Sequence, residues 1–540
     1  MRLNIRNGVL KKCTLLPGET EVILPKRVKI IGEGVFKGCT ALISVVIPDN
    51  VEEIGESAFE DCISLTGIVI PDSVEVIGPS AFEGCVNLES IIIPESINYI
   101  APDALSGTKW MDSQPDGMIY INKMAYRYKG SCTSAFELKA DTTKINDYAF
   151  SDCIGLTELV IPDSVEEIGR GAFKGCINLT NLVIPKSVKV IGVSAFRNCT
   201  DLANLVIQDG VKEIGRAAFE NCTGLTSLVI PKSVEVIDAQ AFQNCTDLTS
   251  IVIPNGIKEI GQAAFESLTN LTSLVLSGGV KRIGISAFAN CTRLTSVVIP
   301  NSVEEIESYA FQNCTRLASV VFPNNVKIGN NVFDNTKWFN SQPEGMIYIN
   351  KIAYRYKGDC PSTVELKADT VKINDCAFEE CSRLTSIVIP GNVEKIGCRA
   401  FGDCTHLTDI AIPDSVKEID WQAFQGCTDL QKIVIPNTVK EIGFRAFYGC
   451  THLTEMVIPD SVKEIGWCAF EGCTRLTSIV IPDSVQEIGE DTFVGCNLKK
   501  LVICASGGSY AEQYAKDNGI RFEPIKNNGK HRRKSNETYN

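Results

Sequence analysis

The stretch Leu476-Thr-Ser-Ile-Val-Ile-Pro-Asp-Ser-Val-Gln-Glu-Ile-Gly-Glu-Asp-Thr-Phe-Val-Gly-Cys496 is one copy of a unit that recurs along most of this 540-residue chain. Units of nearly the same sequence begin at Leu65, Leu156, Leu225, Leu294 and Leu384. Counted on its phenylalanine, the unit of 23 residues occurs about 19 times. A repeat of this length predicts a solenoid, because each unit can bury its apolar side only against the next one.

Apolar residues near the start of each unit predict a short β-strand, since successive side chains of a strand alternate between its two faces. In one unit we expect Leu65, Ile68 and Ile70 to point inward. Val69 then points outward. Pro71 has no N–H to donate and ends the pairing. Stacked units would place these strands side by side in a parallel sheet.

The second half of the unit returns the chain to the next strand. Val74 and Ile77 are expected to turn inward, and Phe59 to enter the space between layers. With rungs about 4.8 Å apart, the rings of successive units can form one offset column along the core. The glycine after the inward isoleucine, as in Gly55 and Gly78, predicts a turn with positive φ.

Sixteen of the 23 cysteines fall at one position of the unit. Leu268 occupies that position once, which indicates a small apolar side chain in the core. Neighbouring thiols would point the same way, which suits disulfide geometry badly. We therefore expect free, buried thiols at Cys39, Cys62, Cys85, Cys153, Cys176, Cys199, Cys222, Cys245, Cys291, Cys314, Cys381, Cys404, Cys427, Cys450, Cys473 and Cys496.

Two near-copies interrupt the array, at residues 108–130 and 336–358. Each contains a proline turn and two short apolar runs joined by an Asn-Lys pair, Asn122-Lys123 in the first copy, which predicts a hairpin. The chain then divides into an N-terminal segment with the first repeats (1–107), a first Trp/Tyr hairpin insert with the return to the repeat (108–149), central repeats (150–335), a second hairpin insert (336–377), C-terminal repeats (378–503), a capping segment (504–525) and a disordered basic tail (526–540).

The capping segment contains Ser509-Tyr-Ala-Glu512, a capping box that predicts a helix to Lys516, followed by a short strand over 520–525. Such a segment can cover the last open layer of a solenoid. The tail contains one basic cluster, residues 530–534. A solvated tail is the simplest interpretation of this cluster, and a localisation or polyanion-binding signal is the alternative.

The repeated motif Ile161-Pro-Asp-Ser-Val-Glu-Glu-Ile-Gly-Arg-Gly-Ala-Phe-Lys-Gly-Cys176 resembles the BspA-like (Treponema pallidum-type) leucine-rich repeats. The resemblance covers roughly residues 20–503. It implies a right-handed leucine-rich-repeat solenoid with a parallel β-sheet on its concave face, and similar inserts occur in that family. It also implies a bacterial surface or secreted protein, or a protist protein, that takes part in adhesion.

The composition is that of a globular chain, with 44% hydrophobic residues, and the formal net charge is −13. An acidic surface repels phosphate groups, so this charge argues against nucleic acid and anionic membranes as partners. No run of 18 apolar residues occurs, so membrane insertion is not expected. The first eight residues contain no apolar stretch, and we expect no signal peptide, in contrast to the surface location that the resemblance implies.

Catalysis requires a few unlike residues brought together, whereas this chain repeats the same residues. His406 and His452 lie at a variable turn position of the unit. There is no Ser-His-Asp spacing, phosphate-binding glycine loop or His-Glu-x-x-His motif. Cys376, Cys398 and Cys468 lie near repeat cysteines, but not at the close spacing of zinc ligands. We therefore predict no enzymatic activity, no cofactor and no metal.

Binding is the function that the pattern favours. Outward valines flanked by Thr or Ser would form a long, weakly charged concave face, and large apolar patches often mark interaction sites, although both residues are also good strand formers. The candidates on this face are Val69, Val183, Val206, Val229, Val252, Val298, Val388, Val457 and Val480. The aromatic residues of the inserts are the second candidates, because aromatic side chains are favoured at binding hot spots; the alternative is that they seal the core where the repeat changes length. These residues are Trp110, Tyr120, Tyr126, Tyr128, Trp338, Tyr348, Tyr354 and Tyr356. Variable loop edges are the third.

The sequence therefore predicts a non-catalytic scaffold for protein–protein interaction, with a protein ligand whose identity it does not specify. Cell-surface adhesion is the setting that the resemblance implies. The alternative is an intracellular structural or self-assembling repeat protein. The oligomeric state stays open.

Overall fold

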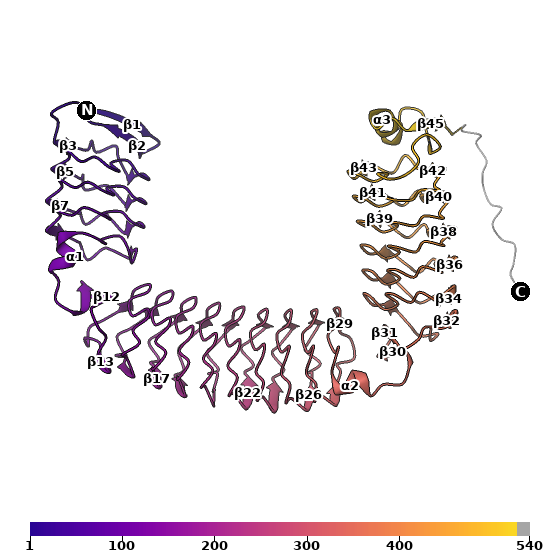
Figure 1. The fold of residues 1–540 in the computed structure, drawn as a ribbon, viewed down its shortest axis with the longest axis horizontal. Helices are drawn as coiled ribbons and strands as arrows, with labels where there is room; N and C mark the ends of the chain where they lie inside the picture. Colours follow the sequence, from indigo (N-terminus) through magenta and orange to yellow (C-terminus); the bar gives the residue numbers. More distant parts are fainter. Residues whose placement is uncertain (526–540) are drawn as a thin grey trace, which may run out of the picture. The chain divides into compact units, whose positions relative to one another are not determined.

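The computed structural model describes residues 1–525, and the predicted basic tail lies outside them. The chain forms a β-solenoid of about 22 turns of about 23 residues, a few more than the phenylalanine count (Figure 1). It separates into two compact units. Unit 1 comprises Met1–Pro323 with Val332–Trp338, and unit 2 comprises Asn324–Asn331 with the residues from Phe339 onward. The predicted division at residues 108, 150, 336, 378, 504 and 526 stays a prediction.

The strands predicted at the start of each unit form what we call the face ladder. Neighbouring strands are parallel and shifted by one repeat, so that Leu182 pairs with Leu205 and Val183 with Val206. Leu65, Ile68 and Ile70 are buried and Val69 is exposed, which confirms the predicted alternation. In unit 1 the face strands are β3 (Glu21–Ile23), β5 (Ser44–Val46), β7 (Gly67–Val69), β9 (Ser90–Ile92), β13 (Ala135–Glu137), β15 (Glu158–Val160), β17 (Asn181–Ile184), β19 (Asn204–Ile207), β22 (Ser250–Ile253), β24 (Ser273–Leu276), β26 (Ser296–Val298) and β28 (Ser319–Val321). In unit 2 they are β32 (Thr363–Glu365), β34 (Ser386–Val388), β36 (Asp409–Ala411), β38 (Lys432–Val434), β40 (Glu455–Val457), β42 (Ser478–Val480) and β44 (Val502–Ala505).

A second set of parallel strands, which we call the return ladder, was not predicted. Each strand has two residues and ends in the inward isoleucine, as in the pairs Glu53↔Val76 and Ile54↔Ile77. The sequence predicted that this isoleucine is buried but not that its backbone pairs with the next turn. In unit 1 these strands are β4 (Ile30–Ile31), β6 (Glu53–Ile54), β8 (Val76–Ile77), β10 (Tyr99–Ile100), β14 (Lys144–Ile145), β16 (Glu167–Ile168), β18 (Val190–Ile191), β20 (Glu213–Ile214), β21 (Val236–Ile237), β23 (Glu259–Ile260), β25 (Arg282–Ile283) and β27 (Glu305–Ile306). In unit 2 they are β29 (Lys327–Ile328), β33 (Lys372–Ile373), β35 (Lys395–Ile396), β37 (Glu418–Ile419), β39 (Glu441–Ile442), β41 (Glu464–Ile465) and β43 (Glu487–Ile488).

A column of phenylalanine rings runs between the two ladders, as predicted. Phe219, Phe242 and Phe265 have no exposed surface. Their ring centroids lie 5.2 and 5.5 Å apart, and the ring planes are within 4° of parallel. Leu105, which replaces the phenylalanine once, is equally buried. The stacked rings supply dispersion contacts between turns that no single turn could form alone.

The glycine after the inward isoleucine does not have positive φ, and that prediction is wrong. Positive φ occurs two and six residues later, at Ser57 (53°) and Asp61 (57°). The glycine suits this position because the backbones of adjacent turns approach each other closely there. A Cβ built on Gly55 would lie 2.9 Å from the carbonyl oxygen of Ile31, and one on Gly192 would lie 2.7 Å from the carbonyl carbon of Gly169.

The repeat cysteines are free thiols, with one exception. Cys153 forms a disulfide with Cys132, which follows the first insert, so the prediction of a free thiol is wrong there. The insert breaks the 23-residue register and brings a non-repeat cysteine to this position. At thirteen of the other fifteen repeat positions, all except Cys39 and Cys381, the thiol donates to the carbonyl of the preceding turn's phenylalanine, as Cys222 Sγ does to Phe196 O at 3.2 Å. Cys39 and Cys496 are half-buried, while the other repeat thiols are buried.

The two inserts contain the predicted hairpins, each preceded by a short helix that was not predicted. The first insert comprises α1 (Lys109–Ser113), β11 (Gly117–Ile121) and β12 (Met124–Lys129), and the second comprises α2 (Lys337–Asn340), β30 (Gly345–Ile349) and β31 (Ile352–Lys357). Both hairpins are antiparallel. Thr108 caps α1 by accepting a hydrogen bond from Met111 N. Strand β12 then continues into the return ladder through β14.

Both ends of the solenoid are covered. At the N-terminus β1 (Arg2–Arg6) pairs antiparallel with β2 (Val9–Thr14), which pairs with β4. At the C-terminus α3 (Tyr510–Asp517) is followed by β45 (Arg521–Pro524), which pairs with β44. Ser509 accepts from Glu512 N at 3.3 Å, while Glu512 accepts from Gly508 N. The predicted capping helix and strand are therefore confirmed.

Candidate binding surfaces

The outward valines of the face ladder form the first candidate surface. Val229 is 78% exposed, and most of the others are between half and two-thirds exposed. Val69, Val183, Val206, Val252, Val298, Val388 and Val457 belong to this exposed set, whereas Val480 is half-buried. The same surface includes the exposed outward residues Ile23, Val46, Ile92, Val160, Val275, Val321 and Val434.

The hydroxyl groups beside these valines hold the turns together. Thr180 Oγ1 donates to Thr157 O at 3.2 Å, and Thr272 Oγ1 donates to Thr249 O at 3.1 Å. Thr477 Oγ1 donates to Thr454 O in unit 2 in the same way. These donors are used within the solenoid, whereas the outward residue two before the valine is exposed and polar in most strands, as at Asn181 and Ser250. The face therefore offers a partner a row of methyl groups beside a row of polar side chains.

The insert aromatics are largely packed into the protein. Tyr126 and Tyr354 are at most 1% exposed. The Tyr126 hydroxyl donates to Ala101 O at 3.1 Å, and burial raises the pKa of this phenol. The other six are half-buried: Trp110, Tyr120, Tyr128, Trp338, Tyr348 and Tyr356. This placement is what the core-sealing interpretation predicts, and it leaves Tyr126 and Tyr354 unable to contact a partner.

The half-buried tyrosines have specific partners within each insert. Lys139 N donates to the Tyr120 hydroxyl at 3.1 Å, and the Lys139 ammonium lies 4.2 Å from the centre of the Tyr120 ring. Tyr348 and Lys367 repeat this arrangement in the second insert, at 3.0 and 4.3 Å. Both inserts therefore use their aromatic rings to fasten the segment that leads back to the repeat.

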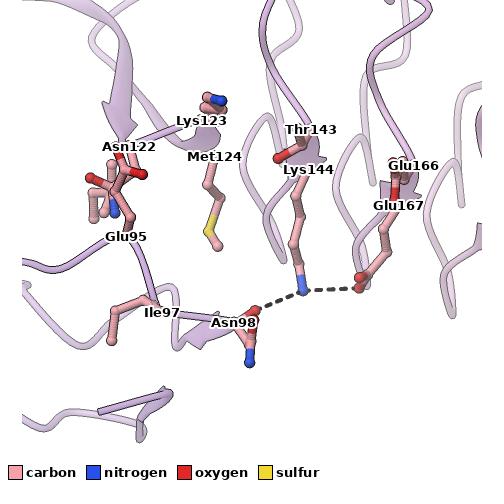
Figure 2. A pocket seen from close by; sticks show the side chains of 11 residues that line it. Glu95, Ile97, Asn98, Asn122, Lys123, Met124, Thr143, Lys144, Glu166 and Glu167 are labelled. Atoms are coloured by element: carbon pink, nitrogen blue, oxygen red, sulfur yellow. Dashed lines mark hydrogen bonds and ion pairs between the residues drawn. The ribbon is translucent and has the colours of Figure 1, made fainter. Parts of the chain in front are cut away.

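A hollow of about 350 Å³ lies where the first insert interrupts the return ladder of unit 1. Figure 2 shows Lys144 between Asn98 and Glu167 at this hollow. The Lys144 ammonium donates to Asn98 O at 3.2 Å and lies 3.0 Å from a Glu167 carboxylate oxygen. The lysine thus bridges the break between β10 and β14, and its charge is already neutralised. We assign the hollow a structural origin.

Two exposed tryptophans in unit 2 were missed. Trp421 and Trp467 are each 58% exposed, and they occupy the same position of the repeat, with Phe444 between them. Their spacing of 23 residues is visible in the sequence and could have been used to find them. They belong to the third predicted class, the variable loop edges.

The described residues contain no cluster of three His, Cys, Asp or Glu side chains that could hold a metal ion. None of the helices within residues 1–525 has the length and apolar character needed to cross a bilayer.

Parallel ladders that repeat every 23 residues around columns of Leu, Ile and Phe define a leucine-rich-repeat β-solenoid. The BspA type Leucine rich repeat region (6 copies) matches residues 4–116, 119–249, 237–357 and 371–499. The chain belongs to this BspA-type leucine-rich-repeat family. No protein of curated function matches the chain.

Several solved structures are similar to the chain. A leucine-rich repeat protein from Bacteroides ovatus ATCC 8483 is 26% identical over 77% of this chain and 100% of its own, with a TM-score of 0.37. A leucine rich cell surface protein from Faecalibacterium prausnitzii A2-165 is 26% identical over 73% of this chain and 92% of its own, with a TM-score of 0.34. The leucine rich repeat protein of T. pallidum is 27% identical over 39% of this chain and 80% of its own, with a TM-score of 0.26.

Proposed function

We propose that this protein is a non-catalytic scaffold that binds a protein ligand through the face ladder. The observation that supports the proposal is the row of outward valines on successive turns of unit 1, from Val183 to Val275, each about half exposed or more. Soluble proteins seldom leave so regular an apolar row uncovered.

The energetics of this row are compatible with binding. Fully burying a valine side chain contributes about 1.5–3 kcal/mol, so covering the exposed half of each contributes roughly 1 kcal/mol. Five valines on consecutive turns therefore supply several kcal/mol. That amount offsets part of the cost of association, about 4–15 kcal/mol, and leaves the remainder to polar contacts at the rim.

Adhesion at the cell surface is the setting that we propose for this binding, because the chain belongs to the BspA-type family. The covered ends favour this interpretation over end-to-end self-assembly. At the start of the return ladder, strand β1 runs antiparallel to β2, so a second copy would not find the parallel edge that continues the repeat there.

The test compares proteins retained by immobilised wild-type chain and by a variant with Val206→Ser, Val229→Ser and Val252→Ser. Val236→Ser is the matched control, since Val236 is a 46% exposed valine on the return ladder of the same turn as Val229. Extracellular-matrix protein, serum and cell lysate are applied to each. We expect one or more proteins to be retained by wild type and control and lost by the triple variant.

The proposed surface is contradicted if the triple variant retains the same proteins at the wild-type level. The binding function is contradicted if wild type retains no protein from any of the three sources, even when each is applied in excess. Light scattering at rising concentration addresses the alternative, because a self-assembling scaffold would increase in mass.

A further inference from the structure

Unit 2 presents a column of aromatic side chains on the edge that follows the return ladder. Trp421, Phe444 and Trp467 lie on three successive turns, joined by backbone hydrogen bonds at this position. Gln422 N donates to Phe444 O at 2.8 Å and Arg445 N donates to Trp467 O at 3.0 Å. Both tryptophans are 58% exposed, and Phe444 is half-buried. We call these three residues the aromatic column.

The next turn leaves room for each indole ring. Trp421 Cδ1 lies 3.1 Å from where a Cβ on Gly443 would be, and Trp467 Cδ1 lies still closer to the corresponding point on Gly489. The rings therefore lie against bare backbone on one side and face solvent on the other. At the equivalent position unit 1 has residues such as Arg216, Ala239 and Ile285, so the column is a property of unit 2.

A row of glutamates runs beside the aromatic column. Glu418, Glu441, Glu464 and Glu487 are the outward residues of β37, β39, β41 and β43, each three residues before the aromatic position of its turn. They stand in register, with Glu441 opposite Glu464 and Glu464 opposite Glu487. Like charges directly opposite one another are unfavourable, and burial together with the neighbouring carboxylates raises the pKa of Glu441.

Most of this negative charge is not neutralised within the described residues. Glu418 is paired with Lys395, but Glu441, Glu464 and Glu487 have no ion pair in the part of the chain that the structure describes. Lys440 and Lys463 directly precede Glu441 and Glu464 in the sequence, whereas the aromatic position follows each glutamate by three residues. The glutamate row therefore makes the neighbourhood of the aromatic column negatively charged, which favours a cationic ligand.

Arg445 already shows the chemistry that this surface accepts. Its guanidinium lies 5.1 Å from the centre of the Phe444 ring and 5.0 Å from that of Tyr448, and it pairs with Glu471 at 3.8 Å. A guanidinium is planar and weakly hydrated, so it can stack on an aromatic face while it donates to a carboxylate. Trp421 and Trp467 are exposed rings on the two adjacent turns, and each follows a glutamate of the row by three residues.

We propose that the aromatic column and its glutamate row bind an arginine-rich segment of a partner protein, with guanidinium groups stacked on the indoles and paired with the carboxylates. Trp421 and Trp467 are two turns apart, about 9.6 Å at ~4.8 Å per turn. Three residues of polyproline II chain span about 9.3 Å. A segment with arginine at every third residue therefore places successive guanidinium groups on the two tryptophans. This surface is separate from the face ladder. A failure of this proposal would therefore leave the function proposed above intact, and a failure of that function would leave this proposal intact.

The probe is a fluorescein-labelled peptide of four Arg-Ala-Pro repeats, titrated with the full chain and followed by anisotropy. The variants are Trp421→Ala/Trp467→Ala and Glu441→Gln/Glu464→Gln. Ile285→Ala is the matched control, because Ile285 occupies the aromatic position in unit 1 and is 39% exposed. A second peptide replaces each arginine by citrulline, which keeps the shape of the side chain and removes its charge. Thermal melting establishes that each variant is folded.

We expect saturable binding of the arginine peptide, with at least tenfold weaker affinity in both double variants and a change of less than twofold in the control. The citrulline peptide should bind at least tenfold more weakly than the arginine peptide. The proposal is overturned if the arginine peptide does not bind, if the tryptophan variant binds as tightly as wild type, or if citrulline is accepted equally.

Discussion

Replacing Phe242 by alanine tests the packing on which the whole fold depends. The ring is fully buried and stacked between Phe219 at 5.2 Å and Phe265 at 5.5 Å. Truncation of a buried phenylalanine to alanine costs about 3–5 kcal/mol, because apolar burial is lost and a cavity is left. Part of that loss is the contact with two neighbouring rings, about 0.5–1.5 kcal/mol for each pair.

In a solenoid this destabilisation should stay local, because each turn contacts only its neighbours. A single free energy of unfolding for the whole chain is therefore a poor measure of it. Native-state hydrogen exchange resolves the effect by turn. At 1.4 kcal/mol for each factor of ten, we expect protection of amides in the turns of Phe219, Phe242 and Phe265 to fall by roughly two to three and a half orders of magnitude.

Two comparisons give this experiment its controls. Phe242→Leu should cost less, about 1–1.5 kcal/mol, since Leu105 fills the same slot with no exposed surface. Amides around Phe447 in unit 2 should keep their protection in both variants. The packing argument is refuted if exchange near Phe242 is unchanged by the alanine substitution, or if protection falls equally along the entire chain.

Three further outcomes follow from the structure. Burial raises the pKa of the Cys13 and Cys496 thiols to about 11 and the pKa of Cys222 above its ordinary 9.0, so the folded state prefers neutral thiols. The stability that these thiols contribute is complete below pH 9 and is lost as the pH rises toward and past 11. The melting temperature should therefore fall between pH 8 and pH 10, and it should fall less in a variant with Cys199→Val, Cys222→Val and Cys245→Val. Reduction of the Cys132–Cys153 disulfide, which joins residues 21 positions apart, should destabilise the segment between these two cysteines by about 3 kcal/mol, measured by exchange of the β13 and β14 amides; equal protection with and without reductant would count against it. Gly192→Ala should destabilise its turn by about 1–3 kcal/mol in urea-dependent exchange, because the added Cβ would meet the backbone of Gly169, whereas Gly278→Ala, where nothing lies nearby, should have little effect.

Much of the fold could be predicted from one repeat. The alternation at Ile68 and Val69 indicated the face strand, and the recurrence of Phe59 every 23 residues indicated the stacked column. These predictions held because periodicity reports which side chains are buried, and identical units can share a core only by stacking in register. The hairpins and the capping helix were also predictable, since turn and capping residues act within a few residues of chain.

Other features depended on which atoms of neighbouring turns meet. The return ladder, the close backbone approach at Gly55 and the disulfide of Cys153 each join residues of different turns. The open faces of Trp421 and Trp467 likewise depend on the glycine of the following turn. A single unit determines what must be buried, because the hydrophobic effect follows side-chain type. Only the stacked turns decide which backbone groups pair, which thiols meet and which rings remain exposed, since those contacts are between units and are absent from any one of them.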